Sequence, residues 1–436
     1  MTEAHSQRAH ATLAPSAAHR WMHCPGSIPM TDGIADKTTA AAAEGTAAHE
    51  LAAYCLETGH DPATFLEMWV DIETEGQNRF ARLDEDPGRD QLRYFEVTEE
   101  MVDAVKEYCA YVLSFAEDND NCLCSVEERL DMTHLHPEVY GTGDATVLQM
   151  KERHLHVFDF KYGKGVVVEV DDNPQLGLYG SGAARRHHNH KLDKVTLHVI
   201  QPRAEHPKGP CRSREYDLIE LLDFEADIQT AGNTVDAARE NRGAIPDEDW
   251  AATYLTAGDW CRFCAAQAVC SARREASLQV AAETFGAVGD DITLTPPDEL
   301  DDERLANILL EADSIGNYVK AVQEFAHSQA CNGKTPKGFK LVAKRANRKW
   351  IDPDTAEDEL AMLGVDTSEM YAEPKFRSPA QLERYFPGKN KDQRQASMAH
   401  LVEKKSSGTN LVPLSDPRPA VKVGAAEEFA TVEGVE

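Results

Sequence analysis

The stretch HLHVFDFKYGKGVVVEVDDNPQLGLYG, residues 154–180, decides the fold. Its first seven residues alternate in the way that a β-strand requires. Asp159 and Lys161 are separated by one residue, so both side chains point to the same face of the predicted strand. Gln175 and Tyr179 are four residues apart and share one face of the helix predicted over Pro174–Arg186. An acid, a lysine, an amide and a phenol are therefore expected close together.

The segments around this stretch predict an α/β protein. The core order is helix, three strands, helix and strand, a pattern of the α/β class. Residues 70–94 are acidic and are predicted to be irregular, and residues 166–170 are a candidate extension of the sheet edge. The predicted strands are Leu123–Leu130, Gly143–Gln149, His154–Phe160 and Val195–Gln201, and the predicted helices besides Pro174–Arg186 are Ala17–Cys24, Thr38–Glu57, Thr98–Glu117 and Leu218–Arg239.

A length of 436 residues favours two domains, or one large domain with an appendage. The composition changes after Phe285, which places the predicted boundary near residue 286. Residues 286–436 are expected to form a C-terminal α+β accessory region. It would hold a long helix at Asp298–Ala330, a strand at Phe339–Lys344 and a loose tail from about Ser406.

The formal net charge of −30 argues against a nucleic-acid partner for the chain as a whole. The distribution of charge matters more, because residues 185–214 hold eight Lys or Arg against two acids. We predict that this basic strip follows a DNA backbone, although a solvated surface segment would have the same composition. No apolar run is long enough for a membrane span and the N-terminus is polar, so we expect a cytoplasmic protein.

Four pieces of sequence are expected to carry the chemistry: Gly143-Asp144, Asp159-Phe160-Lys161, the Gln175/Tyr179 pair, and His49 on the early helix. Two carboxylates on neighbouring strands can hold Mg²⁺ or Mn²⁺, and a histidine nitrogen shifts the preference towards Mn²⁺. A lysine beside them can orient a water and neutralise charge on a phosphorane. Each piece alone is more often a surface ion pair, a turn or a helix cap, so their order and spacing carry the prediction.

That arrangement resembles the RecB-type branch of the PD-(D/E)xK nucleases, over roughly residues 16–285. The resemblance implies a restriction-endonuclease-like core, a mixed sheet flanked by helices. It implies metal ligation by His49, Asp144, Asp159 and the Phe160 carbonyl, with Asp144, Asp159, Lys161, Gln175 and Tyr179 in the catalytic site. The implied activity is a DNA exonuclease or end-processing nuclease.

Two further segments, Ala14–Trp21 and Glu44–Glu50, look like those of phage and prophage proteins of unassigned function. The expected setting is therefore phage recombination or replication in the cytoplasm of a bacterial host. The expected partners are single-stranded DNA or DNA ends and a single-strand binding or annealing protein.

Cys261, Cys264 and Cys270 supply three thiolates on one tight loop, and Cys24 is the best candidate for a fourth ligand. One cysteine before the core and three after it resembles the [4Fe–4S] site of the AddB-type and CRISPR-adaptation nucleases. A four-cysteine zinc site has the same ligand chemistry and remains the alternative. The Cys122-x-Cys124 pair is a competing source of ligands.

Two other functions remain open at this stage. A nuclease fold without turnover would leave a non-catalytic, metal-containing DNA-binding or scaffold protein. A zinc hydrolase acting on a small substrate is disfavoured, because no HExxH run is present. The basic stretch Lys334–Lys349 beside Trp350 is either a second nucleic-acid contact or an edge strand protected by lysines.

Overall fold

A computed structural model describes most of the chain. The described residues are 11–34, 39–74, 76–82, 92–117, 121–285, 301–342, 362, 386–387 and 391–402. Those up to Phe325 belong to one compact unit and those from Ala326 to a second. The predicted domain boundary at 286 falls in 286–300, outside the described residues, and stays a prediction.

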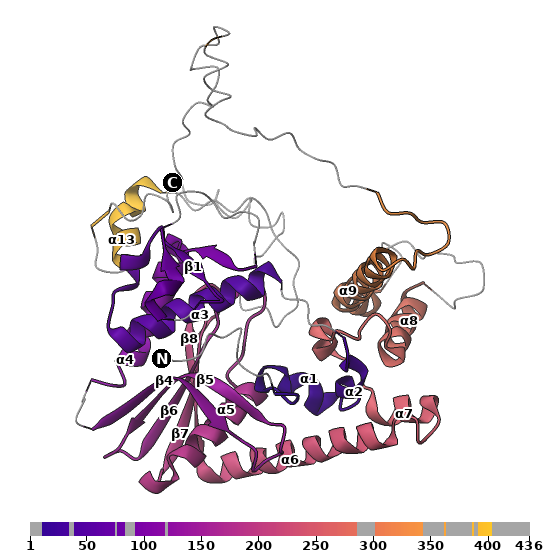
Figure 1. The fold of residues 1–436 in the computed structure, drawn as a ribbon, viewed down its shortest axis with the longest axis horizontal. Helices are drawn as coiled ribbons and strands as arrows, with labels where there is room; N and C mark the ends of the chain where they lie inside the picture. Colours follow the sequence, from indigo (N-terminus) through magenta and orange to yellow (C-terminus); the bar gives the residue numbers. More distant parts are fainter. Residues whose placement is uncertain are drawn as a thin grey trace, which may run out of the picture. The chain divides into compact units, whose positions relative to one another are not determined.

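The centre of the first unit is a five-stranded mixed sheet with the order β4-β5-β6-β7-β8 (Figure 1). Neighbouring strands are antiparallel except β6 and β7, which are parallel and joined by the crossover helix α5. The strands are β4 (Cys122–Asp131), β5 (Tyr140–Gln149), β6 (His154–Phe160), β7 (Lys194–Ile200) and β8 (Cys211–Asp217). The predicted α/β class and the order of its core elements are confirmed.

Helices cover both faces of this sheet. On one face, α3 (Ala40–Thr58) and α4 (Glu99–Leu113) form a core with Ala145, Val147, Phe158 and Phe160. On the other face, α5 (Pro174–Arg186) and α6 (Leu218–Asn241) pack over β6 and β7. Figure 1 shows α3 and α4 on one side of the strands and α5 and α6 on the other.

Local sequence signals explain where α5 begins and how closely it packs. The Asn173 side chain accepts a hydrogen bond from the Leu176 amide, and Pro174 occupies the first turn. A Cβ on Gly180 would lie 2.8 Å from the Leu197 side chain of β7. Because Gly180 has no side chain, α5 lies directly on the sheet. This close packing sets how far Gln175 and Tyr179 of α5 lie from the strands.

Two predictions within this unit were wrong. Residues 70–94 were predicted to be irregular, yet their described part forms a small sheet of β1 (Trp69–Asp71), β2 (Phe80–Ala81) and β3 (Tyr94–Glu96) in the order β2-β1-β3. Arg93 binds both Asp71 carboxylate oxygens, at 2.9 and 2.7 Å. An acidic side chain of this sheet is thus paired with an arginine next to the neighbouring strand. The strands escaped prediction because they are too short to show an alternating pattern.

Residues 166–170 do not extend the sheet edge: they form no strand, and the edge strands of the sheet are β4 and β8. The buried Gln201 side chain satisfies their backbone instead. Its amide nitrogen donates to the carbonyls of Gly163 (2.9 Å) and Val166 (2.7 Å), and its oxygen accepts from the Val168 amide at 3.0 Å. Arg212 also donates to the Val168 carbonyl, so side chains replace strand partners for part of this segment's backbone.

The remaining elements of the described residues are helical. They are η2 (Pro15–Ala17), α1 (Ala18–His23), α2 (Ser27–Thr31), η3 (Pro62–Phe65), η4 (Gly76–Arg79), η5 (His188–His190), α7 (Asp247–Tyr254), η6 (Asp259–Phe263), α8 (Ser271–Phe285), α9 (Asp302–Cys331), α13 (Lys391–Met398) and η9 (Ala399–Leu401). None of the described helices is both long and apolar enough to cross a bilayer.

The described part of the predicted C-terminal α+β region contains helices but no strand. The predicted strand at 339–344 is absent over 339–342, where the Phe339 amide donates to Pro336 in a turn. Gly338 has a φ of 88° at this turn, which reverses the chain before a strand begins. Residues 343–349 of the basic stretch, Trp350 and the tail from 406 lie outside the described residues.

Candidate metal centre

The site forms where β5 and β6 part. Their ladder ends at the pair Ala145–Phe158, while Asp159 and Phe160 continue to pair with β7. One step beyond the ladder, the Asp144 carboxylate accepts the Phe160 amide hydrogen at 2.7 Å. The carboxylate thus takes the place of a strand carbonyl and is held at the opening of the sheet.

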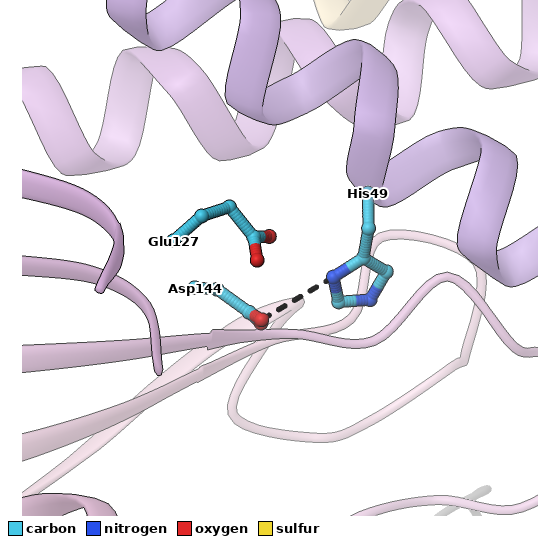
Figure 2. A group of neighbouring side chains, drawn as sticks. All are labelled: His49, Glu127 and Asp144. Atoms are coloured by element: carbon cyan, nitrogen blue, oxygen red, sulfur yellow. Dashed lines mark ion pairs between the residues drawn. The ribbon is translucent and has the colours of Figure 1, made fainter. Parts of the chain in front are cut away.

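Three side chains converge at this opening. His49 comes from α3, Glu127 from β4 and Asp144 from β5, as Figure 2 shows. One ligand atom of each lies within 4.8 Å of those of the other two, and His49 Nδ1 is 3.3 Å from Asp144 Oδ1. A histidine nitrogen and two carboxylates within this span form a donor set suited to Mn²⁺ or Mg²⁺.

Glu127 was not predicted from the sequence. It faces Asp144 across the β4–β5 ladder, whose register runs from Val126–Ala145 to Glu128–Gly143. Its φ of 49° lies in the left-handed region, which is uncommon for a residue with a side chain inside a strand. Neither the pairing register nor this backbone conformation can be read from one sequence.

Strand β5 also turns a different face towards each helical layer on the two sides of Asp144. A Cβ on Gly141 would lie 3.2 Å from Tyr179 of α5, whereas Ala145, four residues later, packs in the core under α3 and α4. Side chains of a regular strand alternate, so these two positions would otherwise share a face. The change of face falls at the Glu127–Asp144 level and brings the carboxylates to the opening.

The electrostatics of the centre match a site for positive charge. Burial alone would lower the pKa of His49, but the charge of Asp144, its hydrogen bond and the charge of Glu127 outweigh burial and raise that pKa. Burial alone would raise the pKa of Asp144, yet His49, Lys161 and the Phe160 amide together lower it. Acidic charge at the centre therefore favours the charged form of His49, as it would favour a bound cation.

The predicted acid, lysine, amide and phenol form a continuous chain beside this centre. Lys161 Nζ lies 3.0 Å from both Asp159 carboxylate oxygens and 3.0 Å from Gln175 Oε1. The Gln175 amide nitrogen donates to the Tyr179 hydroxyl at 3.3 Å. Burial, with the charge of Asp144 added, raises the pKa of Asp159 despite its ion pair with Lys161. Gln175 thus fixes the position of the ammonium group.

Phe160 is held rigidly between the two helices and the sheet. Its ring stacks on Tyr108 of α4 with centroids 4.6 Å apart, and it lies 5.2 Å from the His49 ring. The structure therefore places Asp144 and His49 together as predicted, adds Glu127 to them, and sets Asp159 in the adjacent ion pair with Lys161. The roles of Asp159 and of the Phe160 carbonyl as metal ligands stay predictions.

A second cluster joins the two ends of the core. Cys24, Cys261, Cys264 and Cys270 all line one cavity, together with Arg20, Trp260 and Arg273. The Thr256 amide donates to the Cys24 sulfur at 3.5 Å, across 232 positions of sequence. Burial raises the pKa of the Cys24 thiol to about 11. Four sulfur donors in one largely buried cavity suit a metal or cluster that binds thiolates.

The competing pair Cys122 and Cys124 lies elsewhere. Both are in β4, and the Cys122 thiol donates to the Phe115 carbonyl at 3.6 Å. Cys122 packs against the core under α3 and α4, not against the cavity of Cys24. This alternative source of ligands for the four-cysteine site was therefore wrong.

The predicted basic strip, residues 185–214, is largely neutralised by its own neighbours. Lys194 lies 2.7 Å from Glu215, Arg203 3.0 Å from Glu100 and Arg214 3.0 Å from Asp172. Arg212 is buried and donates to the Val168 carbonyl at 2.7 Å. These pairs hold the loops around β7 and β8, and a DNA track along the whole strip stays a prediction.

The fold and the site together define an α/β protein with a mixed five-stranded sheet, helices on both faces and a candidate divalent-metal centre where two strands part. A family described as "Protein of unknown function (DUF2800)" matches residues 10–419. Because the match covers most of the chain, the protein belongs to the DUF2800 family.

Proposed function

We propose that this protein is a metal-dependent DNA nuclease of the PD-(D/E)xK type. The observation that carries the proposal is the meeting, at the β5–β6 opening, of the His49–Glu127–Asp144 group with the Asp159–Lys161–Gln175 chain. Asp159 pairs with Val199 of β7, and the opening itself is left free of ladder pairing. The core order, α3 then β4, β5, β6, α5 and β7, also agrees with a restriction-endonuclease-like fold.

Each side chain has a role that follows from its contacts. His49, Glu127 and Asp144 would hold Mg²⁺ or Mn²⁺, with Asp159 on the adjacent edge. The bound ion would polarise the scissile phosphate and lower the pKa of a water. Lys161, held by Asp159 and Gln175, would orient the attacking water and stabilise charge on the phosphate oxygens. Tyr179 would keep the Gln175 amide in the orientation that this requires.

We infer that the substrate is DNA, as single strands or at ends, and that the setting is phage recombination or replication. The resemblance to RecB-type exonucleases carries this part. A phosphodiester in an acidic protein needs local positive charge, which the ion and Lys161 supply at the reacting phosphate. A single-strand binding or annealing protein is the partner that such an activity would use.

We propose that the four cysteines hold a [4Fe–4S] cluster. Three of them, Cys261, Cys264 and Cys270, lie close in the sequence, and Cys24 lines the same cavity from far upstream. Zinc ribbons usually present two close pairs of cysteines, so this arrangement of one and three favours the cluster over the zinc alternative. Its role would be structural, because it joins α1 to the segment after α7.

The experiment is digestion of end-labelled single- and double-stranded DNA with Mg²⁺, Mn²⁺ or EDTA. Anaerobically purified wild type is compared with Asp144→Asn, which keeps size and hydrogen bonding but removes the charge that binds the ion. We expect metal-dependent cleavage in the wild type and a loss of at least about 10³-fold in the variant, since the ion carries most of the charge stabilisation.

Cleavage that continues at full rate in Asp144→Asn would remove this centre from the reaction. If the wild type binds DNA but cleaves no substrate with any metal, the nuclease proposal fails, and the non-catalytic DNA-binding scaffold takes its place. Isothermal titration with Mn²⁺ on the same two proteins then separates a site that binds no ion from one that binds an ion without turnover.

A further inference from the structure

A second concave surface lies at the opposite end of α5 from Gln175. It is a groove of about 680 Å³ between the end of α5 and the start of α6. This volume is in the range of sites that bind small molecules or short peptide segments. The lining residues lie outside the proposed catalytic centre, although Arg185 and Arg186 begin the basic strip 185–214 that was predicted to follow DNA.

The groove combines basic and apolar side chains. Arg185, Arg186, His134 and His188 line it, together with leucines from the first turns of α6. Arg186 is paired with Glu128, whereas Arg185 is exposed and forms no ion pair with the residues that the structure describes. His134 lies 3.6 Å from Glu225 in the same groove, so Arg185 is the charged side chain of the lining that is left without an ion pair among the described residues.

The apolar part of the groove continues onto an exposed face of α6. Leu222 is 61% exposed and Ile219 is 70% exposed, while Leu221 is buried beneath them. The helix start itself is already satisfied, because Asp217 and Glu220 form a capping box. Exposed apolar side chains grouped beside a basic rim are typical of a surface that binds a protein segment.

We propose that this groove binds an acidic peptide segment of a partner protein, with its apolar side chains on Leu218 and Leu222 and its carboxylates at Arg185. Charge complementarity selects the acid. The lining disfavours nucleic acid, because none of the residues that line the groove is a Phe, Tyr or Trp that could stack on a base. This binding is independent of the proposed nuclease.

The test is fluorescence anisotropy of the full chain with labelled twelve-residue probes. One peptide alternates glutamate with leucine, one alternates glutamate with serine, one alternates lysine with leucine, and the fourth probe is a single-stranded twelve-nucleotide DNA. We expect the glutamate–leucine peptide to bind at least about tenfold more tightly than the other three, because only it matches both charge and apolar surface.

Arg185→Glu and Leu222→Ser should each weaken that binding by at least about tenfold, since each removes one half of the recognition. The matched controls are Lys320→Glu and Val319→Ser, exposed residues of α9, which should bind as the wild type does. Thermal melts verify that all four variants are folded.

Each remaining outcome contradicts the proposal. Peptide binding that survives in both groove variants lies elsewhere on the chain. Binding of the DNA probe that is lost in Arg185→Glu makes the groove a nucleic-acid site instead. Failure of the glutamate–leucine peptide to bind the wild type removes the acidic peptide as occupant. Because no step depends on DNA cleavage, these results do not bear on the nuclease.

Discussion

At the scale of single residues, Lys161 is the side chain on which turnover should depend most. Its ammonium group is held by Asp159 and Gln175, each at 3.0 Å. Lys161→Ala should leave the His49–Glu127–Asp144 group able to bind Mn²⁺ and lower single-turnover cleavage by about 10²–10³-fold, the usual cost of losing one preorganised donor. Lys164→Ala is the matched control, because Lys164 is exposed and lies 3.6 Å from Glu100, away from the candidate centre. Normal cleavage by Lys161→Ala would exclude the lysine from the reaction.

Glu127 and its neighbour Glu128 offer a matched pair for testing metal binding. Glu127 points to His49 and Asp144, whereas Glu128 pairs with Arg186. Glu127→Gln should weaken Mn²⁺ binding by at least about tenfold, since even partners of metal ligands commonly contribute that much. Titration calorimetry gives the affinity, and Glu128→Gln should leave it unchanged. Equal affinities in the two variants would show that Glu127 is not a ligand.

These residues also show how far one sequence can predict a site. The spacing of Asp159, Lys161, Gln175 and Tyr179 is local, and strand and helix periodicity predicted that they would meet. Glu127 depends on a pairing register between β4 and β5 and on a left-handed backbone, both set by packing. Nothing local to VEER, residues 126–129, distinguishes it from an ordinary charged strand residue.

At the scale of elements, β6 and β7 share a buried histidine network with one consistent arrangement of protons. Gln149 donates to the Phe115 carbonyl, so its oxygen accepts from His156. The other nitrogen of His156 then accepts from His198, at 3.0 Å, and His198 accepts from Tyr111 at 3.1 Å. An added proton on His156 Nδ1 would face the N–H of His198, so this arrangement requires a neutral His156. Burial and the neighbouring histidines disfavour the charged form of His198.

This network predicts a loss of stability in mild acid. Burial and neighbouring positive charge lower the pKa of His156 to about 3 and the pKa of His198 to about 2. The unfolded state takes up these protons below its pKa of about 6.5 and the native state does not, so the stabilisation is present above that pH and declines as pH falls. The unfolding free energy of the wild type should fall between pH 7 and pH 5. In His156→Gln this fall should be smaller by about 2 kcal/mol, as measured by urea unfolding at the two pH values. An unchanged pH dependence would contradict the neutral network.

The elements themselves were predictable to different degrees. The predicted bounds of β6 and of α5 agree with the structure, because β6 alternates cleanly and Asn173-Pro174 is a strong helix start. The edge strand β8 was missed, since Arg212, Arg214 and Glu215 give it the composition of a loop. Charged edge strands protect a sheet from pairing with other chains, and they hide the strand from the pattern.

At the scale of the whole molecule, the order of the core elements along the chain was predictable. The meeting of Cys24 with the three later cysteines was not. The bunched cysteines indicated a metal site, yet only the packing of α1 and α2 beside α7 and η6 brings Cys24 to it. Contacts between residues more than two hundred positions apart leave no local periodicity. The arguments for Cys24 were elimination among the scattered cysteines and the familiar layout of one cysteine before the core and three after it.

The last prediction concerns the cavity in which these four cysteines meet. Cys264→Ser removes a thiolate that lies 3.9 Å from Arg20 and leaves three ligands for the proposed cluster. The variant should be colourless, lack the visible absorbance of a [4Fe–4S] cluster and lose about 2–5 kcal/mol of unfolding free energy, comparable to losing a native cross-link. The thermal midpoint should then fall by about 5 °C or more.

Cys124→Ser, an exposed cysteine in β4, is the control and should stay brown and stable. A brown Cys264→Ser protein would contradict ligation by that thiolate, and a colourless wild type that contains zinc would replace the cluster with the single ion.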